Sequence, residues 1–318
     1  MMSSQLAQQT GAVTRSGRIA CVAPFDLAHS LAFLRGFGPM RGEQVVTDVS
    51  VTKALLHGGQ PVVFTVWQHA SSDHPVLDYR LTAERPLGDA AQQAVTERIA
   101  FFLGAEEDLA PFHALAEADP AFAPLARRLR GLHHVKFPTP FEAACWGAIN
   151  QRIPRALALR MKCALTHHFG KRLVVEGHAH WAFPGPQALA RVGEKELARL
   201  MGNERRARSV DAIARAFVAV DDEFLRRGPL DEVARWLRSI HGVGPFTTAF
   251  VLYRGLGRFR GQPMLAPPLV AAASTVYGRE LSPAQFQRLA QGYGAWGGQW
   301  MLYLWASTFI DDLTASRT

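Results

Sequence analysis

The sequence predicts an α+β protein in which an amino-terminal antiparallel sheet with flanking helices is followed by an all-helical domain. Between Arg18 and Thr82, short β-prone runs alternate with Gly, Ser and Asp-His turns. After Pro111, apolar residues recur at three- and four-residue spacing, which is typical of amphipathic helices. The chain has 318 residues, 48% of them hydrophobic, and is therefore long enough for two modest cores.

The amino-terminal half contains the predicted strands. Residues 60–67 and 76–81 are rich in β-branched and aromatic side chains, and helices over 26–37 and 90–103 are expected to cover one face of the sheet. Residues 1–16 are polar and are expected to be flexible. We place the sheet domain at 17–128 and the helical domain at 129–318.

The second half predicts a bundle of about eight helices. The clearest amphipathic segments are 141–150, 154–169, 186–201, 205–219 and 230–240. Prolines such as Pro140, Pro186 and Pro283 fall in predicted first turns, where their missing N–H costs nothing. A cleft between the two halves of this bundle is the expected ligand site.

Composition limits the classes of partner. The net charge of +8 and the pI near 9.9 favour a polyanion, although an Arg-rich composition by itself is an alternative explanation. Three widely spaced cysteines, Cys21, Cys145 and Cys163, predict no disulfide framework and a reducing compartment. No apolar run approaches the roughly 18 residues of a membrane span. The His pairs lack further ligands at zinc-site spacing, so no metal is predicted. We expect a cytoplasmic, nucleoid-associated monomer.

The most informative segment is 237–255, in which two helical turns are joined by Gly242-Val243-Gly244. Glycines on both sides of one apolar residue allow a sharp turn whose amides can face an anion. A purely structural turn between packed helices is the alternative interpretation. The remainder of the chain favours the first.

From Phe137 onward, the order of motifs resembles the helix-hairpin-helix superfamily of DNA glycosylases, closest to the 3-methyladenine DNA glycosylase II branch. The matching segments are 141–144, 150–153, 183–190, the hairpin with 252–257, and Trp296 with 302–305. The amino-terminal part fits the same branch through 23–26, 33–34 and 97–125, so the resemblance covers about 18–313. It implies a base excision repair protein that flips a damaged base out of DNA.

The resemblance assigns roles to individual residues. Phosphate contact falls to the hairpin amides, and the gap left by the flipped base is filled from a Gln-Arg pair; the residues are Gly242, Gly244, Thr247, Thr248, Gln151 and Arg152. Aromatic rings that hold a positively charged alkylpurine by cation–π contact are Phe33, Phe246, Phe250 and Trp305. These rings could equally belong to the core, and Gln151-Arg152 could be an ordinary exposed helix end. The hairpin carbonyls can hold a monovalent cation; no other cofactor is implied.

One feature of the family is missing. Its catalytic aspartate position coincides with Pro268, and no Asp or Glu occurs between Glu232 and Glu280. A replacement carboxylate could come from Glu142, Asp211, Asp231 or Asp311. Glu142 also has a structural explanation, because an acidic residue in the first turn of a helix favours the helix dipole.

Two hypotheses follow. The first is a monofunctional glycosylase that hydrolyses the N-glycosidic bond of alkylated purines. Lyase activity is not expected, because Phe246 stands where bifunctional relatives have the lysine that forms a Schiff base. The second is a DNA- or lesion-binding protein that keeps the fold without the chemistry. The missing aspartate favours the second hypothesis, whereas the retained hairpin and aromatic positions are compatible with both.

Overall fold

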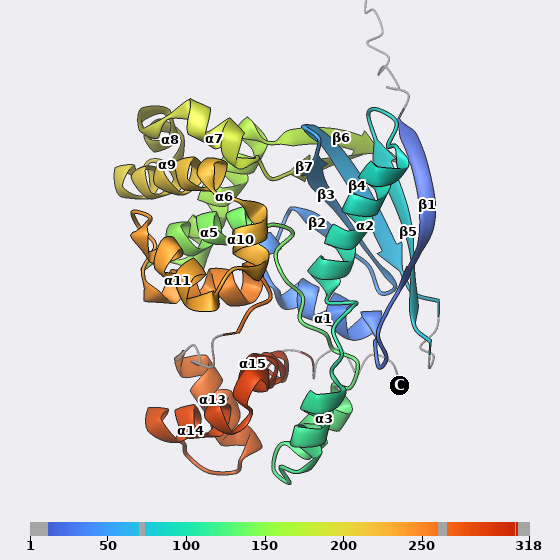
Figure 1. Cartoon of the computed structure of the whole chain (residues 1–318), viewed down its shortest axis with the longest axis vertical. Helices are drawn as coiled ribbons and strands as arrows, with labels where there is room; N and C mark the ends of the chain where they lie inside the picture. The colour runs from blue at the N-terminus through green and yellow to red at the C-terminus, as the bar shows by residue number, and fades with distance from the viewer. Residues whose placement is uncertain (1–11, 70–73, 260–265, 309, 311–318) are drawn as a thin grey trace, which may run out of the picture.

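A five-stranded antiparallel sheet forms the amino-terminal part of the computed structural model, which describes residues 12–69, 74–259, 266–308 and 310. The strand order is β1-β5-β4-β3-β2 (Figure 1). The strands are β1 (Val13–Ala20), β2 (Gln44–Val46), β3 (Ser50–His57), β4 (Gln60–Trp67) and β5 (Val76–Ala83). The predicted strands at 60–67 and 76–81 and the antiparallel sheet are confirmed.

Strand β4 is central and is covered on both faces. Its successive residues Val62, Val63 and Phe64 are all buried, so the apolar run does not alternate as it would in a half-exposed strand. On one face, α2 (Asp89–Leu103) places Phe102 against Phe64, with ring centroids 6.0 Å apart. The other face is covered by an element from the second half of the chain.

That element is a β-hairpin, β6 (Lys171–Val175) and β7 (His178–Ala182), in the region predicted to be all-helical. The prediction is wrong at these residues. Leu173 and Ala182 are buried against Ala54 and Val63 of the large sheet. These residues therefore form strands because they pack against a sheet that is distant in sequence. The short segment 171–182 has no clear apolar periodicity from which strands could be predicted.

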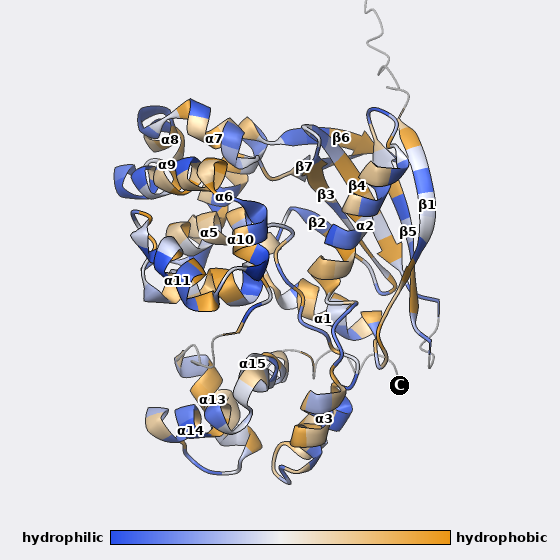
Figure 2. Ribbon diagram, viewed as in Figure 1, coloured by the Kyte–Doolittle hydropathy of each residue, from blue (hydrophilic) through white to orange (hydrophobic). Residues whose placement is uncertain are grey.

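Helix α5 lies among the helices of the second half and contacts α6, α9 and α12. The helices from α5 to α12 are α5 (Pro140–Ile149), α6 (Arg155–Phe169), α7 (Pro186–Val192), α8 (Glu194–Met201), α9 (Glu204–Ala219), α10 (Asp222–Arg227), α11 (Leu230–Ser239) and α12 (Pro245–Phe250). Residues 141–149 of α5 are all buried, and Figure 2 shows the contrast between this apolar helix and the largely hydrophilic α10. The single helix predicted at 186–201 is interrupted at Gly193, whose φ is +80°. Helices near the other four predicted segments are confirmed.

The last helices pack on a segment from the first half. They are α13 (Pro267–Val276), α14 (Pro283–Gly292) and α15 (Gly297–Ala306), and their partners are α3 (Ala110–Glu117) and α4 (Ala123–Arg128) (Figure 1). Phe112 meets Tyr303 at 5.0 Å between ring centroids, and Phe122 meets Tyr293 at 5.5 Å. Within the described ranges, no helix is long and apolar enough to cross a membrane.

A buried ionic network joins the sheet to the helices. Lys162 of α6 is fully buried, and its Nζ donates to Glu142 Oε1 at 2.7 Å, to the Glu43 carboxylate and to the Pro39 carbonyl at 3.1 Å. Lys53 of β3 lies 3.5 Å from Glu43. Burial opposes ionisation of Glu43, but the two ammonium groups outweigh it and hold the pKa of this carboxyl below its usual value. Helix α1 (Leu27–Gly36) lies at the lower end of the sheet in Figure 1.

Lys162→Met should destabilise the protein by about 3–5 kcal/mol, because two buried carboxylates lose their shared cation. Urea unfolding measures the loss. Lys171→Met, at an exposed position of β6, is the matched control and should change stability by no more than about 0.5 kcal/mol. Equal effects of the two substitutions would contradict a stabilising role for the network.

Candidate functional site

The loop between α11 and α12 contains the predicted hairpin turn. Gly242 has φ +85°, and a Cβ there would lie 2.1 Å from Ser209 Oγ, so only glycine fits. Gly244 differs, because its φ of −88° is ordinary and a Cβ would meet nothing within 4 Å. The second glycine is therefore not required by packing within the described protein, and it leaves the backbone open to an outside group.

The first turn of α12 offers few free groups. The Thr248 amide and hydroxyl both donate to the Gly244 carbonyl, at 2.9 and 3.0 Å, and the Thr247 hydroxyl donates to the Gly147 carbonyl at 3.2 Å. Both threonine side chains are buried. Pro245 has no N–H, and the amides of Phe246 and Thr247 have no backbone acceptor among the described residues. The amides of Gly242 and Gly244 likewise donate to no backbone acceptor among the described residues, so all four amides are donors that the turn leaves for an anion.

A second loop, between α5 and α6, is tied directly to the hairpin. Gln151 Nε2 donates to the Gly242 carbonyl at 2.8 Å and contacts Thr247 Oγ1 at 3.1 Å. From α9, Arg206 Nε donates to the Ile149 carbonyl at 2.8 Å, and its guanidinium also bonds to the Gln151 carbonyl. The Gln151 side chain thus holds two loops together.

Arg152 is exposed in this second loop. Its φ is +52°, a left-handed conformation that it shares, among the non-glycine residues described, only with Glu176 in the β6–β7 turn. Such a conformation costs an L-residue about 1–2 kcal/mol. Its guanidinium has no hydrogen bond or ion pair within the described residues. The loop that Gln151 holds against the hairpin therefore contains an exposed arginine whose backbone is strained and whose guanidinium is unpaired among the described residues.

The predicted aromatic residues form two pairs. Phe246 stacks on Phe250 with centroids 6.4 Å apart, and Phe33 meets the edge of Trp305 at 5.2 Å. Their exposure differs widely, from 56% for Phe246 to none for Phe33. Phe250 and Trp305 are partly exposed.

Two rings that sequence reasoning missed connect these pairs. Phe137 meets Phe250 at 5.6 Å and Phe37 at 5.7 Å, and Phe37 meets Trp305 at 5.9 Å. Phe137 and Phe37 are buried. The six rings form a continuous aromatic row from the exposed Phe246 into the core. Phe37 and Phe137 belong to no recognisable motif, so nothing in the sequence indicated that they connect the two pairs.

Arg254 lies at the inner end of this row. Its Cζ is 4.5 Å from the ring centroid of Phe37, 4.9 Å from that of Phe33 and 5.8 Å from that of Trp305, an arrangement that we call the aromatic cage. The side chain is 2% exposed, and its Nε, Nη1 and Nη2 have no hydrogen-bond acceptor among the described residues. Burial lowers the pKa of Arg254 to about 10, so the group stays charged at neutral pH.

Arg254 belongs to the π-helical turn η2 (Val251–Gly255) that follows α12. Such turns occur frequently at functional sites. Arg254 comes directly after the uncharged run 242–253, which is a signal in the sequence for an unusual arginine. The resemblance included Arg254 in a motif but assigned it no role.

The candidate carboxylates do not gather beside the rings. Pro268 is exposed in the first turn of α13. Glu142 is ion-paired with Lys162, while its amide is capped by Thr139 Oγ1 at 3.1 Å. Asp211 pairs with Arg215 at 2.8 Å, Asp231 is exposed in the first turn of α11, and Asp311 lies outside the described residues.

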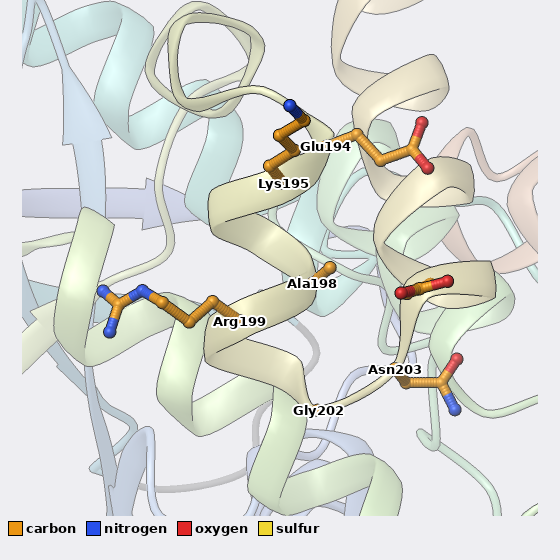
Figure 3. Close-up of a pocket in the computed structure, with 7 residues that line it drawn as sticks. Glu194, Lys195, Ala198, Arg199, Gly202 and Asn203 are labelled. Atoms are coloured by element: carbon orange, nitrogen blue, oxygen red, sulfur yellow. The ribbon is translucent and has the colours of Figure 1, made fainter.

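A surface hollow of about 580 Å³ lies at α8 and the start of α9. Its lining includes Glu194, Lys195 and Arg199 of α8, which extend to different sides of that helix, and Asn203, which precedes α9 (Figure 3). None of the predicted site residues lines it. It therefore offers no convergent set of groups.

In the described ranges, no group of three or more His, Cys, Asp or Glu side chains could hold a metal ion. At the hairpin, the Ile240 and Gly242 carbonyls each already accept one hydrogen bond. The monovalent cation at this loop stays a prediction.

Comparison with known structures defines the class of fold. A 3-methyladenine DNA glycosylase from Archaeoglobus fulgidus superposes with a TM-score of 0.75 at 19% identity, over 91% of this chain and 97% of that one. The apo 8-oxoguanine glycosylase/lyase from Clostridium acetobutylicum gives 0.67 at 14% identity, over 93% and 98%. The chain thus has the fold of these two DNA glycosylases, which agrees with the resemblance predicted from the sequence.

Among curated proteins, the DNA-3-methyladenine glycosylase of Bacillus subtilis (strain 168) is 30% identical over 178 residues. The match covers 55% of this chain and 59% of that protein, less than two thirds of its length. A comparison with protein-family models found no match. The predicted resemblance to 3-methyladenine DNA glycosylases is confirmed.

Arg152→Gly should raise the free energy of unfolding by about 1 kcal/mol, because glycine adopts the left-handed conformation without strain. Glu176→Gly, at the matching conformation in the β6–β7 turn, is the control and should show a somewhat smaller gain, because it also removes the exposed ion pair with Arg80 at 3.0 Å. Urea denaturation compares the two. A loss of stability confined to Arg152→Gly would mean that its side chain supports the fold.

Proposed function

We propose that the chain is a DNA glycosylase of base excision repair that binds DNA, flips out alkylated purines and hydrolyses their N-glycosidic bond. The observation that supports this most is the bond between Gln151 and the Gly242 carbonyl. It places the strained Arg152 loop beside the hairpin turn. The similarity to DNA-3-methyladenine glycosylases adds independent support.

Each requirement of base flipping has a candidate group. The open backbone at Gly244 and the free amides of Phe246 and Thr247 suit a DNA phosphate. Arg152 suits the gap left in the base stack, because a guanidinium is planar and can stack on neighbouring bases. The exposed ring of Phe246 suits the flipped base. Gly242, Gln151 and Thr248 then have supporting roles, since their polar groups hold the loops in place.

The proposed reaction is hydrolysis. Water adds to the sugar C1′ as the C–N bond breaks, the departing base keeps the bonding electrons, and water's proton is lost to solvent. Phe246 has no amine, so an imine intermediate is not available at that position. We propose a monomer acting on chromosomal DNA in the cytoplasm, with a sheet domain at 17–128 and a helical domain at 129–318.

A second candidate function is lesion binding without chemistry. Pro268 can neither accept a proton nor stabilise a sugar cation, and the chain has no acid between Glu232 and Glu280. Glu142 does not compensate in our proposal, because its carboxylate faces Lys162 at 2.7 Å. This hypothesis needs the same DNA-binding loops and predicts no base release.

Free base released from methylated DNA, measured by mass spectrometry, should separate the two functions. We expect release by the wild type, and equal rates for Glu142→Gln and Glu43→Gln once corrected for folded fraction, because both carboxylates belong to one buried network. Loss confined to Glu142→Gln would make Glu142 the relocated catalytic carboxylate. Binding of damaged DNA without release by the wild type would establish the second function.

Gly244→Ala should weaken DNA binding by about tenfold, since a methyl group would block approach of a phosphate to the loop amides. Gly88→Ala is the matched control, because Gly88 is also a helix N-cap with ordinary φ and open surroundings. Fluorescence anisotropy with a duplex measures both. Equal affinities would exclude this loop from the DNA interface, provided that both variants are folded by circular dichroism.

A further inference from the structure

The segment between Glu142 and Glu176 contains no acidic residue but is rich in cations. They are Arg152, Arg155, Arg160, Lys162, Lys171 and Arg172. Lys162 is buried and ion-paired, whereas the others are exposed and have no ion-pair partner among the described residues. This part of the surface therefore has positive charge that the protein itself does not neutralise.

Arginines on the neighbouring helices are in a different state. Arg215 of α9 lies 2.8 Å from Asp211, and Arg227 of α10 lies 3.3 Å from Glu223. A cation that is already paired must give up its carboxylate before it can bind a phosphate. An unpaired cation only has to displace water and to release counterions from the phosphates, and this release favours binding.

Helix α6 presents its exposed residues along one face. At 3.6 residues per turn, Ala156, Arg160 and His167 lie within about 40° of one another around the helix axis. All three are exposed, whereas Lys162, which lies on the other side of the helix, is buried. The exposed face begins beside the loop that contains Arg152 and extends to the last turn of the helix.

The β6–β7 hairpin continues this face beyond the end of α6. The ring of His167 lies 4.9 Å from that of Trp181 between centroids, and the guanidinium of Arg172 lies 6.0 Å from the centroid of the same tryptophan. Only Gly170 separates the helix from the hairpin, and a Cβ at Gly170 would collide with two backbone carbonyl oxygens. Because only glycine fits there, the helix and the hairpin keep one relative orientation.

The contact between Arg172 and Trp181 leaves the guanidinium able to bind an anion. The two residues are cross-strand partners in the hairpin, and Arg172 is exposed. An arginine over an aromatic ring keeps its charge, and its N–H groups point away from the ring plane's centre toward solvent. The tryptophan therefore restricts the position of a charged group whose hydrogen-bond donors remain available.

The length of this face corresponds to a short stretch of DNA. Helix α6 has 15 residues and is about 22 Å long. Base pairs of duplex DNA are about 3.4 Å apart along the axis, so the face spans about six base pairs. At its near end, Gln151 holds the Arg152 loop against the Gly242 carbonyl of the hairpin turn. The face is thus continuous with the loops proposed to bind DNA.

We propose that Arg152, Arg160, His167 and Arg172 form a basic track that binds the phosphate backbone of the duplex on one side of the damaged base, out to about six base pairs from it. The assignment rests on the proposed function, because the occupant is the same DNA. Contacts with phosphates position a protein on DNA without reading its sequence. The track therefore adds affinity and orientation, whereas lesion recognition stays with the loops.

Binding to duplexes with different flanks tests the track. Each duplex contains one N7-methylguanine on a 2′-fluoro sugar, which slows loss of the base. One duplex has 12 base pairs on both sides of the lesion, and two others have only three base pairs on the 5′ or on the 3′ side. Fluorescence anisotropy over a series of salt concentrations gives the affinity and its salt dependence.

The double variant Arg160→Gln with Arg172→Gln should bind the long duplex about tenfold more weakly than the wild type. The slope of log K against log salt should become shallower by about 1.8, because two phosphate contacts are lost. On one of the two shortened duplexes, the loss should shrink to less than twofold, because the flank that the track binds is missing.

The matched control is Arg215→Gln with Arg227→Gln. It removes the same net charge from exposed arginines that are paired with acids, and it should change the affinity less than twofold. Circular dichroism confirms that both double variants are folded. Equal losses in the two double variants would mean that only net charge matters and would overturn the track.

Failure of the track and failure of the proposed function give different results. If the wild type binds the lesion duplexes but Arg160→Gln with Arg172→Gln binds them as tightly, the track is wrong and the proposed function stands. If the double variant loses the same affinity on all three duplexes, these arginines do not bind the flank, and the track is again wrong. If the wild type binds none of the duplexes, the proposed function fails together with the track.

Discussion

The arrangement of this protein depends on a buried ionic network centred on Lys162. Its ammonium group is shared by Glu43, which follows α1, and Glu142, at the start of α5. Because α5 and α6 flank residues 150–154, the network that orients these helices against the sheet also orients the loop that contacts the hairpin. The desolvation of these charges is repaid only when all partners are in place, so the network favours one relative position of sheet and helices.

Two buried cations, Lys162 and Arg254, have different kinds of neighbour. Lys162 is neutralised by carboxylates and serves the fold. Arg254 is surrounded by aromatic faces, and its guanidinium donors have no acceptor among the described residues, an arrangement that is costly for stability. The same contrast explains why Glu142 suits structure better than catalysis, since its carboxylate is already committed to a cation.

Local patterns predicted most of the secondary structure because they depend on neighbours in sequence. Asp26 caps α1 by accepting from the Ala28 amide at 2.8 Å, and Thr139 caps α5. The pattern failed where a distant surface decides: the β6–β7 hairpin exists because Leu173 meets the sheet. Likewise Gly193, not apolar periodicity, ends α7.

For the candidate site, the sequence by itself determined the Gly-Val-Gly turn, the resemblance that indicated Gln151 and Arg152, and the absence of a carboxylate at Pro268. Only the tertiary structure decided that the Gln151 side chain ties two loops together and that Arg254 lies within the aromatic cage. The physical reason is that a turn is a local property of a few backbone dihedrals. Burial and the hydrogen bonds between elements depend instead on residues far apart in the sequence, such as Gln151 and Gly242, which are 91 positions apart.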